Sequence, residues 1–169
     1  MPESTAAYTL PGPGDTDRLG AALAAAIAAE KAGIAEKGLA MRLEGDLGAG
    51  KTSLVRALLR ATGFEGPVKS PTFSLLETYP LFGLTLNHFD FYRFEDPEEF
   101  EDAGFRDAFG PGQVAATEWT AKAMPFVPDA DLRVTLSPEG TGRRALVEAL
   151  SPLGSAVLAH LPKDLTTHA

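Results

Sequence analysis

The sequence predicts one α/β domain built on a mixed central sheet. First, an apolar segment at 39–43 leads through a glycine-rich turn into an amphipathic helix at 54–60. Second, residues 74–79 and 84–90 form a hairpin-like pair, and so do the later segments around 132–150. Third, 169 residues with 44% hydrophobic content are enough for one core.

The N-terminal part is expected to form an edge strand and one long helix. Residues 8–10 suit a short strand, and the proline- and glycine-rich residues 11–14 suit a turn. Asp15 or Thr16 is expected to cap the helix, which should end at Gly38. The apolar stripe of this helix is Leu19, Leu23, Ile27 and Ile34.

The glycine-rich turn fits the phosphate-binding pattern G-x-x-x-x-G-K-[ST]. Residues 45–52 read Gly-Asp-Leu-Gly-Ala-Gly-Lys-Thr, between the predicted strand and helix. Glycines allow successive backbone N–H groups to face a phosphate chain closely. Lys51 would supply positive charge for the β- and γ-phosphates, and the Thr52 hydroxyl suits Mg²⁺. The motif therefore predicts a nucleotide site in a P-loop NTPase-like three-layer fold.

The middle of the chain is expected to add two strands and a short helix. After a loop at 63–67, the segments 74–79 and 84–90 are joined by a turn at 80–83. Six of the eight residues 95–102 are acidic. The simplest interpretation is a helix N-terminus in which Asp96 caps and Pro97 takes the first position, and the alternative is a docking patch for a basic partner.

The C-terminal part is expected to complete the sheet. Residues 114–117 suit a short buried strand, and 132–136 and 145–150 suit a closing hairpin. The tail should carry a helix at 154–161 and then fray. We therefore assign residues 1–150 to the nucleotide-binding domain and 151–169 to an extension of unknown role.

Two acids complete the candidate site. Asp90 and Glu118 each directly follow an apolar strand-like segment, where a P-loop protein needs a carboxylate for Mg²⁺ or for water. Spacing alone does not say which acid faces the metal. Thr72 follows Ser-Pro and is a candidate sensor of the γ-phosphate. His88 is interpreted as a structural strand residue and Trp119 as a core or interface aromatic.

Composition narrows the classes of function. The chain has no cysteine, which excludes disulfides, thiolate zinc sites and cysteine nucleophiles. A net charge of −8 argues against gripping a nucleic acid backbone directly. If the protein acts in RNA chemistry, we expect a partner protein to bind the RNA. The N-terminus lacks a basic signal region and the apolar run 19–29 is too short to span a bilayer, so we expect a cytoplasmic protein without membrane contact.

In combination, four motifs in this order resemble the bacterial TsaE family, over about residues 10–147. The motifs lie at 45–52, 68–73 (Val-Lys-Ser-Pro-Thr-Phe), 88–93 (His-Phe-Asp-Phe-Tyr-Arg) and 118–119 (Glu-Trp). This family is the small P-loop ATPase of tRNA threonylcarbamoyladenosine synthesis. It commonly has two threonines after the P-loop lysine, where this chain has Thr52-Ser53 and keeps the hydroxyl.

The resemblance implies a role for each candidate residue. Thr52 and Glu118 would hold Mg²⁺, Thr72 would belong to a switch loop, and Asp90 would be a second acid needed for turnover. The catalytic set would be Lys51, Asp90 and Glu118. The residues expected to contact ATP are Gly45, Asp46, Gly48, Ala49, Gly50, Lys51, Thr52, Ser53, Thr72, Gly142 and Arg143.

The resemblance also implies a function and partners. The expectation is a weak, Mg²⁺-dependent ATPase stimulated by a TsaB–TsaD complex, whose TsaD subunit modifies adenosine 37 of tRNAs reading ANN codons. The protein would meet tRNA only through those partners. The chain itself shows no obvious arginine finger: Arg93 and Arg143 are the candidates within it, and a partner could supply one. The extension from Ser151 matches no family pattern.

Three alternatives remain open at this level. A P-loop small-molecule kinase would share the motif but should carry an arginine-rich lid, which is not evident. A GTP switch usually has Asn-Lys-x-Asp, whereas the only asparagine, Asn87, precedes His88. A nucleotide-dependent scaffold would bind ATP without needing turnover.

Overall fold

The central sheet of the computed structural model, which describes residues 4–165, runs in the order β1-β7-β6-β2-β5-β4-β3. The strands are β1 (Ser4–Leu10), β2 (Leu39–Glu44), β3 (Leu76–Leu81), β4 (Leu84–Asp90), β5 (Gln113–Glu118), β6 (Leu132–Glu139) and β7 (Gly142–Ala149). The helices are α1 (Pro13–Ala29), α2 (Lys31–Lys37), α3 (Lys51–Ala61), α4 (Glu99–Asp102) and α5 (Pro152–Leu158), with 3-10 turns η1 (Phe105–Ala108) and η2 (Thr120–Ala123).

The sheet is parallel at its centre and antiparallel at both sides. Strand β2 pairs in parallel with β5 and β6, and β5 pairs in parallel with β4. The pairs β3–β4, β6–β7 and β1–β7 are antiparallel, which confirms both predicted hairpins and the mixed sheet. Because neighbouring parallel strands end at one edge, the C-terminal ends of β2, β4 and β5 lie together.

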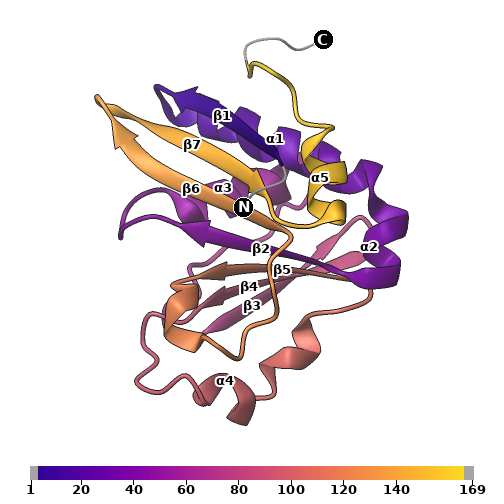
Figure 1. The fold of residues 1–169 in the computed structure, drawn as a ribbon. Helices are drawn as coiled ribbons and strands as arrows, with labels where there is room; N and C mark the ends of the chain where they lie inside the picture. The colour runs from indigo at the N-terminus through magenta and orange to yellow at the C-terminus, as the bar shows by residue number, and fades with distance from the viewer. Residues whose placement is uncertain (1–3, 166–169) are drawn as a thin grey trace.

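Alternating side chains place two cores on opposite faces of the sheet. In β5, Val114 and Ala116 join the larger core and Ala115 joins the other. The larger core includes buried residues of α1, α3 and α5, and α1 and α5 lie together beside β1 and β7 (Figure 1). The second core is a phenylalanine cluster beneath α4 and η1, which lie away from α1 in Figure 1. These short elements form the third layer.

Helix α3 packs very closely against α1 at Gly20. A Cβ atom there would lie 2.4 Å from the Cβ of Ala57 and 2.7 Å from the backbone nitrogen of Leu58. Only glycine permits this separation without displacing a helix. The contact matters for the site because α3 begins with Lys51 and Thr52.

The structure corrects the predicted N-terminal helix. Gly12 is the N-cap and Pro13 opens the helix, whereas Asp15 lies three residues on and accepts the Gly12 N–H at 2.9 Å. The helix is also two helices, since α1 ends at Ala29. The break at Glu30 redirects α2, so that the Ile34 carbonyl accepts the Gly112 N–H. Helical periodicity does not report this tertiary contact.

Several later boundaries also differ from prediction: β5, β6 and β7 are Gln113–Glu118, Leu132–Glu139 and Gly142–Ala149, and three further differences have a local cause. Strand β3 starts at Leu76 because Leu75 adopts a left-handed turn (φ 69°), and it continues through Leu81. The acidic segment becomes helical only at Glu99, while Asp96 accepts the Glu98 N–H. Helix α5 spans Pro152–Leu158 behind a Ser151 cap.

The tail beyond α5 does not fray as expected. Leu165 packs in the larger core, and the Tyr8 hydroxyl donates to the Pro162 carbonyl. The prediction for residues 166–169 falls outside the described residues.

Candidate nucleotide-binding site

The glycine-rich loop connects the end of β2 to the start of α3. Gly45, Gly48 and Gly50 have φ values of 147°, 80° and 104°, a range that side chains with a Cβ rarely adopt. A Cβ at Gly45 would also lie 2.7 Å from the Leu136 carbonyl oxygen. The glycines of the motif are therefore required by this backbone path.

A pocket of about 240 Å³ opens beside this loop. Its lining residues are Leu47, Gly48, Ala49, Gly50, Lys51, Thr52, Ser53, Ser70, Thr72, Asp90, Glu118, Trp119 and Arg143. The structure thus brings together most of the residues predicted to contact ATP, Mg²⁺ or water. Asp46 and Gly142 line an adjoining pocket on the same loop, and Gly45 contributes its carbonyl group to the site.

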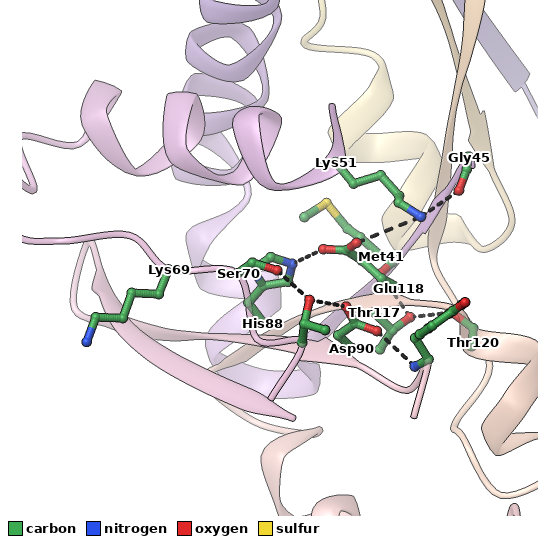
Figure 2. Close-up of polar contacts among 12 residues, drawn as sticks. Met41, Gly45, Lys51, Lys69, Ser70, His88, Asp90, Thr117, Glu118 and Thr120 are labelled. Carbon is green, nitrogen blue, oxygen red and sulfur yellow. Dashed lines mark hydrogen bonds and ion pairs between the residues drawn. The ribbon is translucent and has the colours of Figure 1, made fainter. Parts of the chain in front are cut away.

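Lys51 reaches from the start of α3 toward Gly45 and Glu118 (Figure 2). Its ammonium group donates to the Gly45 carbonyl at 2.5 Å and lies 3.8 Å from Oε1 of Glu118. It also lies 4.5 Å from the centre of the Trp119 ring, a cation–π distance. Only 5% of the residue is exposed, so its charge acts in a low-dielectric setting.

Asp90 and Glu118 end adjacent parallel strands and are register partners. Both are buried, with 4% exposure each. Oδ1 of Asp90 accepts the Tyr92 N–H at 2.8 Å, and Oδ2 accepts the Thr72 hydroxyl at 3.3 Å. Oε2 of Glu118 lies 2.5 Å from Nε2 of His88.

Burial raises the pKa of Asp90 above its ordinary value. The nearby charge of Glu118 raises this pKa further, while the Tyr92 N–H, the Thr72 hydroxyl and the Lys51 charge oppose the shift. A carboxylate with a raised pKa is a better proton acceptor. Asp90 is therefore suited to orient or activate a water molecule.

Ser70 and Thr72 bring a second loop to the pocket. Their hydroxyl oxygens are 2.8 Å apart, and Thr72 joins them to Asp90. The next residue, Phe73, is 81% exposed, and the Arg93 guanidinium lies 4.6 Å from its ring centre. Arg143 lines the pocket instead, where it donates to the Gly48 carbonyl at 3.0 Å.

The donor set fits Mg²⁺ held jointly with phosphate. Within residues 4–165, no group of three or more His, Cys, Asp or Glu residues could hold a metal ion alone. Magnesium in P-loop sites needs less from the protein, because phosphate oxygens and water fill the other positions. Thr52 and Glu118 line one pocket and offer hard oxygen ligands of the right kind.

No binding role was predicted from the sequence for three residues that lie at or beside the pocket. Trp119 and Ser70 line the pocket, and His88 contacts Glu118. A signal for His88 was present, because period-2 alternation places it on the same face of β4 as Asp90. The contact with Glu118 depends on the register between β4 and β5, which cannot be predicted from the sequence of either strand.

The glycine-rich turn between β2 and α3, beside a sheet with a parallel centre, defines a protein of P-loop NTPase-like fold. A sequence profile for "Threonylcarbamoyl adenosine biosynthesis protein TsaE" matches residues 10–146. The chain belongs to the TsaE family of tRNA threonylcarbamoyladenosine biosynthesis proteins.

Individual relatives agree with this assignment. The chain is 40% identical to TsaE of Haemophilus influenzae over 124 residues, which covers 73% of this chain and 78% of the relative. It is 36% identical to TsaE of Bacillus subtilis over 121 residues, 72% and 75% of the two chains.

The crystal structure of Bacillus subtilis YdiB shares the fold, with a TM-score of 0.73 and 24% identity. The match covers 92% of this chain and 93% of the YdiB chain. Within residues 4–165, none of the helices is long and apolar enough to span a membrane.

Proposed function

We propose that this protein is a weak Mg²⁺-dependent ATPase that assists a TsaB–TsaD-type complex in modifying adenosine 37 of tRNAs that read ANN codons. One observation carries the proposal: a single pocket gathers Lys51, Thr52, Thr72, Asp90 and Glu118 from separate segments of the chain. Their chemistry matches the parts needed for phosphoryl transfer to water.

The loop residues would bind the triphosphate. Backbone N–H groups of residues 48–52 would cradle the phosphates, and Lys51 would exchange its contact with the Gly45 carbonyl for phosphate oxygens. Thr52 and Glu118 would hold Mg²⁺, which neutralises phosphate charge when it is bound. Arg143 would approach from β7 across Gly50.

Asp90 and Thr72 would act at the γ-phosphate. The raised pKa of Asp90 favours proton acceptance from an attacking water, and the Thr72 hydroxyl, 3.3 Å from Asp90, would sense the phosphate. Lys51 would stabilise charge as it develops. Hydrolysis would therefore rest on positioning and electrostatics.

A pair of isosteric variants tests these roles. Asp90→Asn should bind ATP about as well as wild type and lower turnover about 10²- to 10⁴-fold, the usual contribution of a general base. Glu118→Gln should lose the strengthening of ATP binding by Mg²⁺. Calorimetric ATP titrations with Mg²⁺ and with EDTA, and phosphate-release rates, measure both effects. Failure of wild type to bind ATP would overturn the proposal.

Partner stimulation is expected because the pocket offers little free positive charge. Among residues 4–165, Arg143 is the arginine that lines it, and its guanidinium is already hydrogen-bonded to Gly48. We predict slow phosphate release by the isolated protein and faster release when a TsaB–TsaD complex is added. Equal rates in both conditions would contradict the partner model. Formation of a phosphorylated metabolite, instead of free phosphate, would favour a kinase.

A further inference from the structure

We propose that His88 is a positioning residue for Glu118: it holds one carboxylate oxygen so that the other remains directed to the pocket. This inference deepens the proposed function and rests on it. His88 begins the motif at 88–93 but was assigned no binding or catalytic role, and it does not line the pocket. It acts through Glu118.

The contact joins two adjacent strands in the interior. Nε2 of His88 on β4 lies 2.5 Å from Oε2 of Glu118 at the end of β5. The imidazole is completely buried, and Glu118 is 4% exposed. Figure 2 shows His88 on one side of the carboxylate and Lys51 on the other. Each oxygen of Glu118 therefore faces a different partner.

The burial pattern defines the tautomer. A carboxylate accepts hydrogen bonds, so the proton shared with Glu118 is on Nε2 of His88. Nδ1 is buried and has no hydrogen-bond partner within the described part of the chain. Because a buried N–H without an acceptor is destabilising, a proton on Nδ1 would be unfavourable. The geometry therefore points to an Nε2–H imidazole that donates to Glu118.

The position of Lys51 shows what this donation prevents. Its ammonium group lies 3.8 Å from Oε1 of Glu118, beyond the length of a good charge-assisted hydrogen bond. Without the His88 donor, the carboxylate would be free to rotate toward Lys51 and form a closer ion pair. The carboxylate of Glu118 would then be less available to Mg²⁺. Such supporting hydrogen bonds commonly tune metal affinity.

Two variants and a control test the inference. His88→Met removes the donor at similar volume, and His88→Gln places an amide donor near the position of Nε2. His160→Met is the control, because His160 pairs with Glu30 at the exposed surface. ATP affinity is measured by calorimetry with Mg²⁺ and with EDTA, and thermal unfolding of the nucleotide-free chains reports folding.

His88→Met should weaken ATP binding about 10- to 100-fold in Mg²⁺, with unchanged binding in EDTA. His88→Gln should restore most of the Mg²⁺ effect, and His160→Met should match wild type. If His88→Met binds ATP as tightly as wild type in Mg²⁺, this inference is overturned and the proposed function is not affected. An equal loss in Mg²⁺ and EDTA also overturns it, since His88 would then support the pocket in general.

A nitrogen spectrum of the wild-type imidazole, recorded without nucleotide, does not depend on the variants. A proton on Nε2 of His88 supports the inference, and an Nε2 without a proton overturns it even if His88→Met does not fold. Absence of ATP binding by wild type would instead overturn the proposed function. The two failures are thus separable.

Discussion

At the scale of single residues, Asp90 shows how burial and hydrogen bonding oppose each other. Its carboxyl group is buried at the end of β4, which raises its pKa, while the Tyr92 N–H and the Thr72 hydroxyl favour the ionised form. The effect of burial on the pKa is the larger of the two. The folded protein therefore holds the Asp90 carboxylate at some expense of stability, which is common for groups that perform chemistry.

This destabilisation of the folded state by the charged carboxylate predicts a pH-dependent effect of Asp90→Asn. The folded pKa lies above the unfolded value of about 3.9, so the contribution of Asp90 to stability is full below that value and is lost as pH rises through the folded pKa. Asp90→Asn should therefore be more stable than wild type at pH 7, and this advantage should shrink below about pH 4. Thermal unfolding at both pH values measures it.

Asp129→Asn provides the control, because Asp129 is exposed and its replacement should change stability by less than about 0.5 kcal/mol. A less stable Asp90→Asn at pH 7 would contradict the prediction. It would mean that the hydrogen bonds to the charged carboxylate outweigh the cost of burying it.

At the scale of elements, the close packing of α1 on α3 places the glycine-rich loop. The loop ends where α3 begins, and Gly20 of α1 lets the two helices approach near Ala57. The apolar stripe of α1 was predictable from its period. The need for glycine at position 20 was not, because it arises only when α3 lies across α1.

Gly20→Ala should therefore destabilise the protein. The added methyl group would lie 2.4 Å from the Ala57 Cβ and close to the α3 backbone, so one helix must shift. Overpacking of this kind costs about 1–3 kcal/mol. Gly14→Ala is the matched control in the same helix, since its nearest contact is the flexible Arg18 side chain at 3.7 Å. It should be stabilising by about 0.5–1 kcal/mol. Denaturant unfolding of both variants measures the difference.

At the scale of the whole molecule, the C-terminal extension is part of the same packed body. Val157 of α5 is fully buried in the larger core, and α5 contacts β7, β1 and α1. Asp131, just before β6, accepts hydrogen bonds from the Ser151 hydroxyl and the Ala40 N–H, which ties the extension to two strands. This role was not visible in the sequence, which indicated a short helix there but matched no family pattern from Ser151 on.

Val157→Ala should consequently reduce the stability of the entire domain. Removing a buried branched side chain leaves a cavity, and the expected loss is about 1–3 kcal/mol. Ala159→Ser, at an exposed position just beyond α5, should change stability by less than about 0.5 kcal/mol. The midpoint of thermal unfolding reports both. A Val157→Ala protein as stable as wild type would indicate that the extension is only loosely attached.

Local patterns were sufficient for the glycine-rich loop, both hairpins and the two strand-end acids. These features depend on neighbouring residues, since a phosphate cradle is built from consecutive N–H groups and a hairpin from adjacent strands. The meeting of Lys51, His88 and Glu118 instead required the sheet order β2-β5-β4. Arg143 reaches Gly48 only because β7 follows β6 back along the sheet. Such contacts join residues far apart in the chain, so only the folded sheet determines them.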